Sequence, residues 1–223
     1  MRKCVRDFVR IFAEAVPAAE PIYEFGSFQA SNSGASVDLR PIFPGKEYVG
    51  CDMREGPGVD MILNLHDMAL PAETAATVLV LETLEHVEYP HKAMEEVYRI
   101  TRPDGMVLIS SVMNFPIHEY PFDYWRFTPE AFRSLLRPFH SSLVGFAGEH
   151  DFPHTVFGIA CKGAWAPTND LVRQIESWKK RWFYQEGNPW RQIRRQFTPP
   201  IVRTARKRIK RLLRESRAHR AGT

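Results

Sequence analysis

Residues 77–87 read TVLVLETLEHV, an apolar run that passes directly into an acidic segment with a histidine. The run over 77–81 is almost wholly apolar, which is typical of a strand buried on both faces of a parallel sheet. On either side of it, short apolar runs alternate with helical patterns along the chain. This alternation predicts an α/β fold with a mainly parallel sheet in which residues 77–81 are a central strand.

Periodicity and turn signals predict the other elements. Thr128 followed by Pro129 marks the start of a helix that runs to about residue 136. Residues 102–105, Arg-Pro-Asp-Gly, are expected to form a turn. The further expected elements are helices over 3–15 and 90–102, and strands over 21–25, 47–52, 59–63, 106–112, 142–148 and 155–161.

The composition indicates one sizeable domain with an appendage. Two full domains would be cramped in 223 residues, and 44% hydrophobic residues suffice for a buried core. No apolar run approaches the roughly 20 residues of a transmembrane helix, and charges interrupt the first sixteen positions, where a signal peptide would be apolar. The cysteines lack CxxC spacing, which disfavours a disulfide framework or zinc site. We expect a cytoplasmic protein and leave peripheral association with a membrane open.

Charge divides the chain into two parts. Residues 169–223 contain 16 Lys and Arg against 4 Asp and Glu, a net charge of +12, whereas residues 1–168 contain 14 against 22, a net charge of −8. We therefore expect a domain over 1–168 and a basic helical C-terminal extension over 169–223. Residues 201–220 place apolar positions in a stripe between Arg and Lys. Such a helix suits an anionic membrane surface, a nucleic acid or the acidic domain itself, and the sequence does not choose among them.

Four short segments, taken in their order along the chain, indicate the class of protein. Residues 23–28, YEFGSF, end a predicted strand in an acid and a glycine, and residues 48–53, YVGCDM, end the next strand in an aspartate. Residues 81–87, LETLEHV, and 99–105, RITRPDG, complete the set. Over about residues 20–162 this order resembles the class I S-adenosylmethionine-dependent methyltransferases, in particular their small methyltransferase-domain group. The resemblance implies a Rossmann-like fold, a mostly parallel seven-stranded sheet with an antiparallel last strand.

The resemblance also implies S-adenosylmethionine as the cofactor and assigns residues to it. Glu24, Gly26 and Ser27 would line its methionine end. Asp52 would accept hydrogen bonds from both ribose hydroxyls, since one carboxylate offers acceptors to two donors. The other cofactor-binding residues would be Met53, His66, Asp67, Leu81 and Glu82.

The first cofactor loop departs from the family pattern. Phe28 and Ala30 occupy positions where the family usually has glycine. S-Adenosylmethionine has no pyrophosphate for backbone amides to cradle, so the requirement for glycine is looser than in dinucleotide sites. A pocket filled by Phe28 would favour a non-catalytic binding protein.

Residues 115–127, FPIHEYPFDYWRF, follow the fifth predicted strand, where this family places its acceptor site. Aromatic walls with a few polar groups suit a small organic or sugar-like acceptor. His118 is the first candidate for a general base, because an ordinary imidazole titrates near neutral pH, and Asp123 is the second. The alternative is a cover over the sheet in which Arg126 pairs with Asp123. The candidate acceptor-binding residues are Tyr120, Tyr124, Trp125 and Arg126.

Glu82, Glu85 and His86 stand at i, i+3 and i+4, so a helical turn would project all three from one face. A similar E-x-x-E-H pattern marks metal-dependent small-RNA and quinone O-methyltransferases. The Leu-Glu-His core also recurs in metal-free relatives, and no downstream ligand is secure, so we predict no metal.

The sequence thus predicts an enzyme that transfers a methyl group from S-adenosylmethionine to an oxygen or nitrogen nucleophile of a small molecule or glycan precursor. The sulfonium is a good leaving group, so catalysis needs mainly in-line positioning and exclusion of water. Two alternatives stay open: an RNA methyltransferase that uses the basic tail, and a non-catalytic binding protein with a degenerate cofactor loop.

Overall fold

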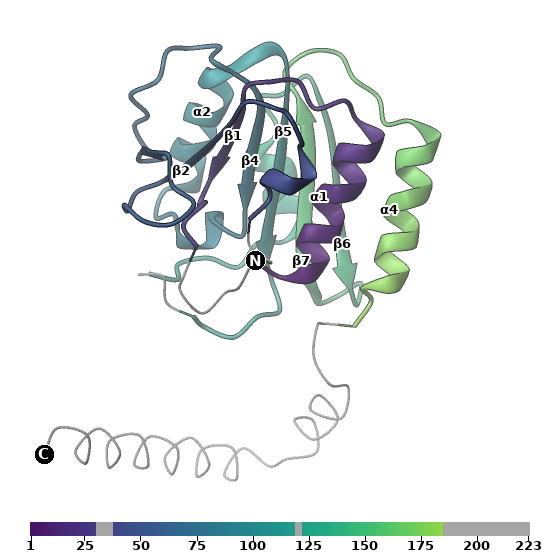
Figure 1. Ribbon diagram of the computed structural model, residues 1–223. Helices are drawn as coiled ribbons and strands as arrows, with labels where there is room; N and C mark the ends of the chain where they lie inside the picture. The colour runs from purple at the N-terminus through teal and green to yellow at the C-terminus, as the bar shows by residue number, and fades with distance from the viewer. Residues whose placement is uncertain (30–37, 119–121, 185–223) are drawn as a thin grey trace, which may run out of the picture. The chain divides into compact units, whose positions relative to one another are not determined.

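The computed structural model describes residues 1–29, 38–118 and 122–184, which form an α/β unit built on a seven-stranded sheet (Figure 1). The strand order is β3-β2-β1-β4-β5-β7-β6. β1 pairs in parallel with β2 and β4, and β4 with β5, whereas β7 is antiparallel to β5 and β6. The expected sheet is confirmed, with β4 at its centre. The strands are β1 (Ile22–Phe25), β2 (Tyr48–Asp52), β3 (Met61–Ile62), β4 (Ala75–Leu81), β5 (Thr101–Val112), β6 (Ser141–Gly148) and β7 (Pro153–Cys161).

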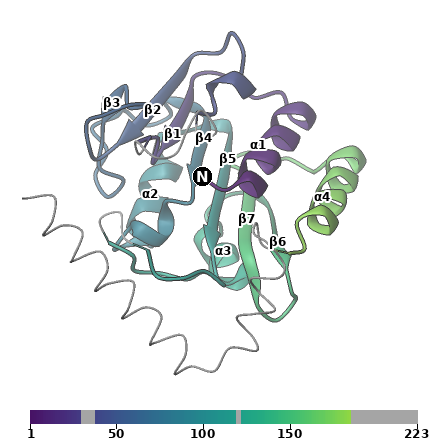
Figure 2. The same ribbon diagram turned by 60° about the horizontal axis from the view of Figure 1, so that its bottom comes forward.

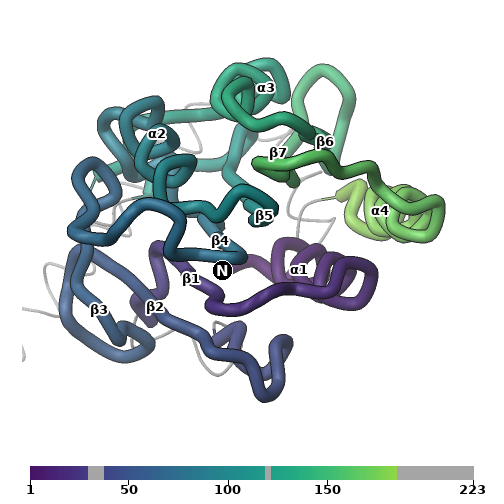
Figure 3. Tube along the Cα trace, turned by 90° about the horizontal axis from the view of Figure 1, so that it is seen from above, coloured from purple at the N-terminus to yellow at the C-terminus, as the bar shows by residue number. Residues whose placement is uncertain are grey.

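Helices cover both faces of the sheet. α2 and α3 pack on one face, and α1 with α4 on the other (Figures 2 and 3). The predicted helices form close to their expected bounds, and the Thr128 side chain caps α3 by accepting a hydrogen bond from the Ala131 N–H. The helices are α1 (Lys3–Ala15), α2 (Pro90–Ile100), α3 (Pro129–Leu135) and α4 (Asn169–Arg181), with the short 3-10 helices η2 (Arg40–Ile42) and η3 (Leu84–His86).

α4 packs against α1 although the chain from residue 169 onward is strongly basic. The Trp178 ring centroid lies 5.4 Å from that of Phe8, and the Trp178 Nε1–H donates to the Cys4 carbonyl at 2.8 Å. The boundary expected between residues 168 and 169 is inferred from the change in net charge. The charged residues of α4 lie on its exposed face, however, and its other face is buried. α4 belongs to the compact unit that runs from Met1 to Gln185. Its buried residues are Leu171, Ile175 and Trp178.

The turn predicted over residues 102–105 is wrong, because these residues lie inside β5. Thr101 pairs with Ala75 and Met106 with Thr77, so four residues of β5 stand opposite one residue of β4. Pro103 has no N–H to give to the ladder, and a bulge accommodates it. The Pro-Asp-Gly signal therefore reports a local interruption of a strand and not its beginning.

No helix in the described ranges is long and apolar enough to span a membrane. The predicted basic helix over 201–220, like Tyr120 and Ala30, lies outside the described residues.

The carboxyl ends of the parallel strands β1, β2, β4 and β5 meet at one edge of the sheet, where the N-terminus also lies (Figure 1). Ligands of open α/β sheets bind outside this edge. The loops that follow these strands are therefore where a functional site is expected.

Candidate active site

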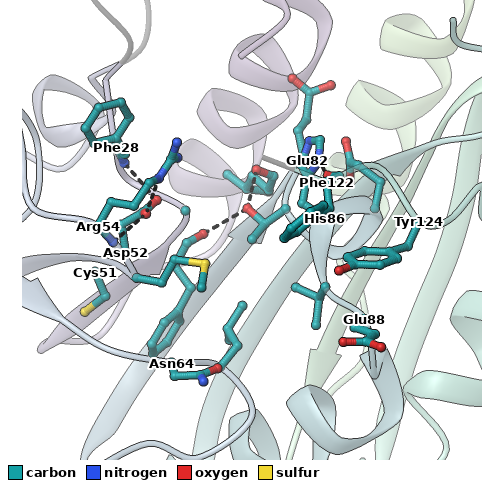
Figure 4. A pocket seen from close by; sticks show the side chains of 18 of the residues that line it. Phe28, Cys51, Asp52, Arg54, Asn64, Glu82, His86, Glu88, Phe122 and Tyr124 are labelled. Atoms are coloured by element: carbon teal, nitrogen blue, oxygen red, sulfur yellow. Dashed lines mark hydrogen bonds and ion pairs between the residues drawn. The ribbon is translucent and has the colours of Figure 1, made fainter. Parts of the chain in front are cut away.

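A cavity of about 580 Å³ opens at this edge of the sheet. One part lies beyond β1 and β2 and is lined by Gly26, Phe28, Asp52 and Arg54. The other part lies beyond β4 and β5 and is lined by Glu82, Glu85, His86, His118 and Tyr124. Figure 4 shows Asp52 and Arg54 on one side of the cavity and His86 and Tyr124 on the other.

The loop after β1 approaches the end of β4 at Gly26. This residue has a φ of +87°, and a Cβ there would lie 2.1 Å from Thr83 Oγ1. The Thr83 hydroxyl lies 3.1 Å from the Phe25 carbonyl oxygen and 3.0 Å from that of Leu81, so it links the two strand ends. Glycine is required here both for its backbone conformation and for this close approach.

Asp52 is the last residue of β2 and is only 8% exposed. Its Oδ1 accepts hydrogen bonds from the Arg54 N–H at 3.1 Å and the Arg54 Nε–H at 3.2 Å, and its Oδ2 accepts from the Phe28 N–H at 3.4 Å. A carboxylate offers about four lone-pair positions. Three of these positions are occupied, so Asp52 keeps one open position on Oδ2, and a second becomes open for a diol when the 39% exposed Arg54 side chain moves off Oδ1.

Phe28 forms a wall of the cavity and does not fill it. Its ring packs against Gly56, where a Cβ would lie 2.3 Å from the Phe28 Cε2. The Arg54 guanidinium lies 4.3 Å from the centre of the same ring (Figure 4). Phe28, which stands in the loop after β1 where the family usually has glycine, thus fits because Gly56 in the loop after β2 has no side chain.

His66 lines the cavity beyond β3, whereas Asp67 is exposed and does not. The Nε2 of His66 accepts a hydrogen bond from the Tyr89 N–H at 3.1 Å, and its Nδ1 lies 3.1 Å from Asn64 Oδ1. These two contacts fix the plane of the imidazole. Met53, Leu81 and Glu82, also expected on the cofactor side, line the cavity.

Glu24 and Ser27, expected at the methionine end of a cofactor, do not line the cavity. The Glu24 carboxylate is buried and accepts a hydrogen bond from the Tyr48 hydroxyl at 2.8 Å, and burial raises its pKa to about 7. Successive side chains of a strand point to opposite faces, so Glu24 and Phe25 diverge. Ser27 is buried beside Gly50, where a Cβ would lie 2.9 Å from the Ser27 Oγ.

Glu82 binds Arg2, a residue that sequence analysis misses because 80 positions separate the two. The Arg2 Nε–H and backbone N–H both donate to the Glu82 carboxylate, the latter at 2.7 Å. Burial works to raise the pKa of Glu82, but the ion pair and hydrogen bonds with Arg2 outweigh it and hold this pKa below its usual value. Glu82 has a φ of +51°, a strained conformation of the kind that clusters at functional sites.

Glu82 lies before the 3-10 turn of residues 84–86 and has a positive φ, so the helical turn that would carry Glu82, Glu85 and His86 on one face does not form. The Glu85 carboxylate accepts a hydrogen bond from the Ser111 hydroxyl at 2.6 Å, and burial together with the Glu82 charge raises its pKa to about 7. Glu85, His86 and His118 each bring one potential ligand atom within 4.8 Å of the others. The group that the structure brings together therefore contains His118 and not Glu82.

His118 and Asp123 form a pair beside this group. The His118 ring Nδ1 lies 3.2 Å from Asp123 Oδ2, and the backbone N–H of His118 donates a hydrogen bond to the same oxygen at 2.7 Å. Arg126 donates to the Asp123 carboxylate through Nη1 at 2.5 Å and Nη2 at 2.7 Å. The hydrogen bonds from Arg126 hold the pKa of Asp123 well below its usual range. Asp123 therefore stays ionised and orients the imidazole, which lines the cavity.

The expected acceptor-binding residues separate in the structure. Tyr124 lines the cavity, Arg126 is engaged with Asp123, and the Trp125 Nε1–H donates to the Glu88 carbonyl at 3.2 Å outside the lining. The ion pair between Arg126 and Asp123 that the alternative interpretation requires is thus present. Phe115 and Phe122 line the cavity instead, from the same segment.

Comparison with known proteins agrees with this geometry. Residues 45–109 match the family model described as a methyltransferase domain. No curated protein sequence matches the chain. A SAM-dependent methyltransferase from Archaeoglobus fulgidus is 14% identical with a TM-score of 0.55, over 73% of this chain and 95% of that one.

A second similar structure is the 1,6-didemethyltoxoflavin-N1-methyltransferase of Burkholderia thailandensis, with bound 1,6-didemethyltoxoflavin and S-adenosylhomocysteine. It is 14% identical with a TM-score of 0.54, over 73% of this chain and 80% of that one. Likenesses at this identity show a shared fold, and the family match covers the segment from β2 to β5. The chain thus has the fold of these S-adenosylmethionine-dependent methyltransferases, and its residues 45–109 are similar to the methyltransferase-domain family model.

Proposed function

We propose that the chain transfers a methyl group from S-adenosylmethionine to an oxygen or nitrogen nucleophile of a small molecule or glycan precursor. The observation that carries this proposal is a single cavity lined by both Asp52 and His118. Asp52 has acceptor capacity suited to a ribose diol, and His118 has an orienting carboxylate behind it. A cofactor site and a candidate general base thus open into the same space.

The residues that line the cavity beyond β2 and β3 suit S-adenosylmethionine. The Asp52 carboxylate lies at the end of β2, and Leu65 and His66 offer flat and apolar contacts for a purine beyond β3. When bound, S-adenosylmethionine supplies an activated methyl group on a sulfonium. A cavity of about 580 Å³ also falls within the range of small-molecule sites, roughly 300–1,000 Å³.

Aromatic rings flank His118 on the acceptor side. The Phe115 ring lies 5.1 Å from the His118 ring, and the Phe122 and Tyr124 rings lie 5.6 Å apart at the rim. Such walls suit the flat face of an aromatic ring or a sugar. Glu85 and Glu88 also line the cavity, and their carboxyl groups disfavour a phosphodiester. These features support a small acceptor over RNA.

His118 is the residue that we assign to proton removal. Its Nδ1 faces the ionised Asp123, so Nε2 is the nitrogen left to accept a proton from a hydroxyl or ammonium acceptor. Asp123 positions the ring and stabilises the imidazolium that forms, the role that a buried carboxylate has beside a catalytic histidine. Asp123 is therefore a positioning residue, with Arg126 as its anchor.

A panel of acceptors tests this proposal. The full chain is incubated with S-adenosylmethionine and phenols, catechols, amines, sugars or single-stranded RNA, and S-adenosylhomocysteine formation is measured. We expect formation that depends on a small acceptor, survives chelation of divalent cations and is lost in Asp52→Ala. Methylation of RNA alone, or cofactor binding without turnover on any acceptor class, would overturn the proposal in favour of one of the two alternatives. Loss of activity on chelation would make the group of Glu85, His86 and His118 a cation site.

A further inference from the structure

Four large apolar side chains, which we call the edge residues, are exposed near the mouth of the cavity and do not line it. They are Ile117 and Trp125 in the segment after β5, and Phe183 and Tyr184 after the end of α4. Their exposed fractions run from 43% for Phe183 to 86% for Ile117. The cavity therefore does not explain why these side chains face water.

The end of α4 lies beside the segment after β5. The carbonyl oxygen of Trp182, the first residue after the helix, lies 2.7 Å from His154 Nε2, and the His154 carbonyl accepts a hydrogen bond from Arg2 at 3.2 Å. The Arg2 guanidinium lies 5.4 Å from the centre of the Phe115 ring, at the start of the segment after β5. Figure 1 shows α4 ending at the edge of the sheet where the N-terminus lies. The edge residues thus share one side of the domain, and exposed apolar groups gathered in this way mark an interaction surface.

Positive charge begins at the same place. The last turn of α4 holds Lys179, Lys180 and Arg181. The chain continues into residues 185–223, which contain 12 Lys and Arg against 2 Glu. Nine of these basic residues fall within 201–220, where the sequence predicts an amphipathic helix. The apolar stripe of that predicted helix is Ile201, Val202, Ala205, Ile209, Leu212 and Leu213.

Aliphatic side chains decide between the two anionic partners that such charge attracts. A single-stranded nucleic acid is bound by basic side chains along its backbone and by flat rings that stack on its bases. Ile117 and the aliphatic stripe serve neither purpose, whereas a bilayer buries such side chains at the boundary between headgroups and acyl chains. Trp125 and Tyr184 suit the same boundary, because each has an apolar body and a polar tip. The combination favours a lipid surface.

The domain itself does not supply the electrostatic attraction. Residues 1–168 carry a net charge of −8, and Glu149 and Asp151 are exposed in the hairpin between β6 and β7. The attraction must therefore come from the basic residues after 168, and the edge residues add apolar contact. Charge and apolar contact are then two contributions that can be removed separately.

We propose that the edge residues and the basic C-terminal segment together bind the surface of an anionic lipid bilayer. The cavity, which opens at the same edge of the sheet, then faces the bilayer. This inference goes beyond the proposed function and does not depend on it, because no step of methyl transfer is involved.

Co-sedimentation of the full chain with vesicles tests the proposal. The vesicles consist of phosphatidylcholine alone or of an equal mixture with phosphatidylglycerol, and wild type is expected to bind the mixture at least about 100-fold more tightly. The combined variant Arg206→Gln, Lys207→Gln, Lys210→Gln and Arg211→Gln is expected to lose about 100- to 1,000-fold of this affinity. Each basic residue near an anionic surface contributes about fivefold.

The contribution of the edge residues has a matched control. Ile117→Ser combined with Phe183→Ser is expected to weaken binding to the anionic vesicles about 10-fold or more, because two apolar side chains no longer enter the bilayer. Val172→Ser removes a similarly exposed apolar side chain from the first turn of α4, at the other end of the helix, and is expected to leave binding within twofold. Thermal unfolding of both variants checks that they remain folded.

Results of three kinds would overturn the inference. Wild type that binds no vesicles, or both kinds equally, would do so without any variant, and binding of single-stranded RNA in that case would assign the basic segment to a nucleic acid. Undiminished binding by the variant with four glutamines would remove the role of charge. Equal binding by Ile117→Ser with Phe183→Ser and by Val172→Ser would remove the edge residues from the contact.

Discussion

The His118 Nδ1 lies 3.2 Å from the Asp123 Oδ2, and this contact determines which imidazole nitrogen is free. An ionised carboxylate beside Nδ1 holds the ring proton there. Nε2 is then an acceptor for a proton from the substrate. Arg126 keeps the carboxylate in place from its other side.

We predict that His118→Gln lowers kcat about 100- to 10,000-fold with a hydroxyl acceptor, the usual contribution of general-base catalysis. The affinity for S-adenosylhomocysteine is expected to stay within twofold of wild type, because the imidazole lies on the acceptor side of the cavity. Steady-state kinetics and calorimetry measure the two quantities. Unchanged turnover would remove His118 from the mechanism.

Asp123→Asn should also lower kcat, by on the order of 100-fold or more, while the affinity for S-adenosylhomocysteine stays within twofold. The amide keeps the shape of the side chain but removes the charge that orients and stabilises the imidazole. Glu130→Gln is the matched control, because Arg133 and Glu130 form an exposed pair with the same i,i+3 spacing. Equal kcat values for the two variants would contradict the role of Asp123.

Glu24→Gln is expected to stabilise the protein at pH 8 more than at pH 5. Burial raises the pKa of Glu24 to about 7 from an ordinary value of 4.5, so the folded state holds this proton more tightly than the unfolded state. The stability from this carboxyl is complete below pH 4.5 and is lost as the pH rises to 7. The amide avoids a loss on the order of 3 kcal/mol and still accepts from Tyr48.

Urea unfolding of Glu24→Gln at the two pH values measures this difference. The affinity for S-adenosylhomocysteine serves as the control and should not change, because Glu24 does not line the cavity. A difference in the free energy of unfolding that is the same at pH 5 and pH 8 would show that Glu24 titrates normally in the folded protein.

Trp178→Ala should reduce the free energy of unfolding by about 3–5 kcal/mol, the usual loss for a buried aromatic residue. Trp178 is 3% exposed and packs on Phe8 across the two helices. Val172→Ala, at a position of the same helix that is 41% exposed, should have a much smaller effect. If unfolding were unchanged in Trp178→Ala, α4 would not stabilise the domain.

The helices and strands that the sequence predicts well are those whose hydrophobic pattern lies within a single segment. The apolar run of β4 and the stripe of α1 can be read within one segment, because burial imposes a period of 2 or 3.6 on the residues themselves. The mainly parallel pairing of the sheet then follows from the alternation of strands and helices. The position of Asp52 at the end of β2 can be predicted for the same reason.

The site residues that the sequence does not predict depend on distant contacts. Arg2 reaches Glu82 across 80 positions, and no local pattern records this pair. Glu24 is misjudged because a strand sends alternate side chains to opposite faces, so its loop motif suggests a cavity that the side chain does not reach. His118 is found by its chemistry, but its grouping with Glu85 and His86 needs the folded loop.

Calorimetric titration with S-adenosylhomocysteine tests the central claim most directly, with wild type, Asp52→Ala and Asp67→Ala. Asp67 is the control, an exposed aspartate that does not line the cavity. We predict micromolar binding by wild type and Asp67→Ala, and a loss of about 30-fold or more in Asp52→Ala, since two charge-assisted hydrogen bonds to the ribose are removed. Absence of binding by wild type, or equal binding by Asp52→Ala, would contradict the assignment of this cavity to the cofactor.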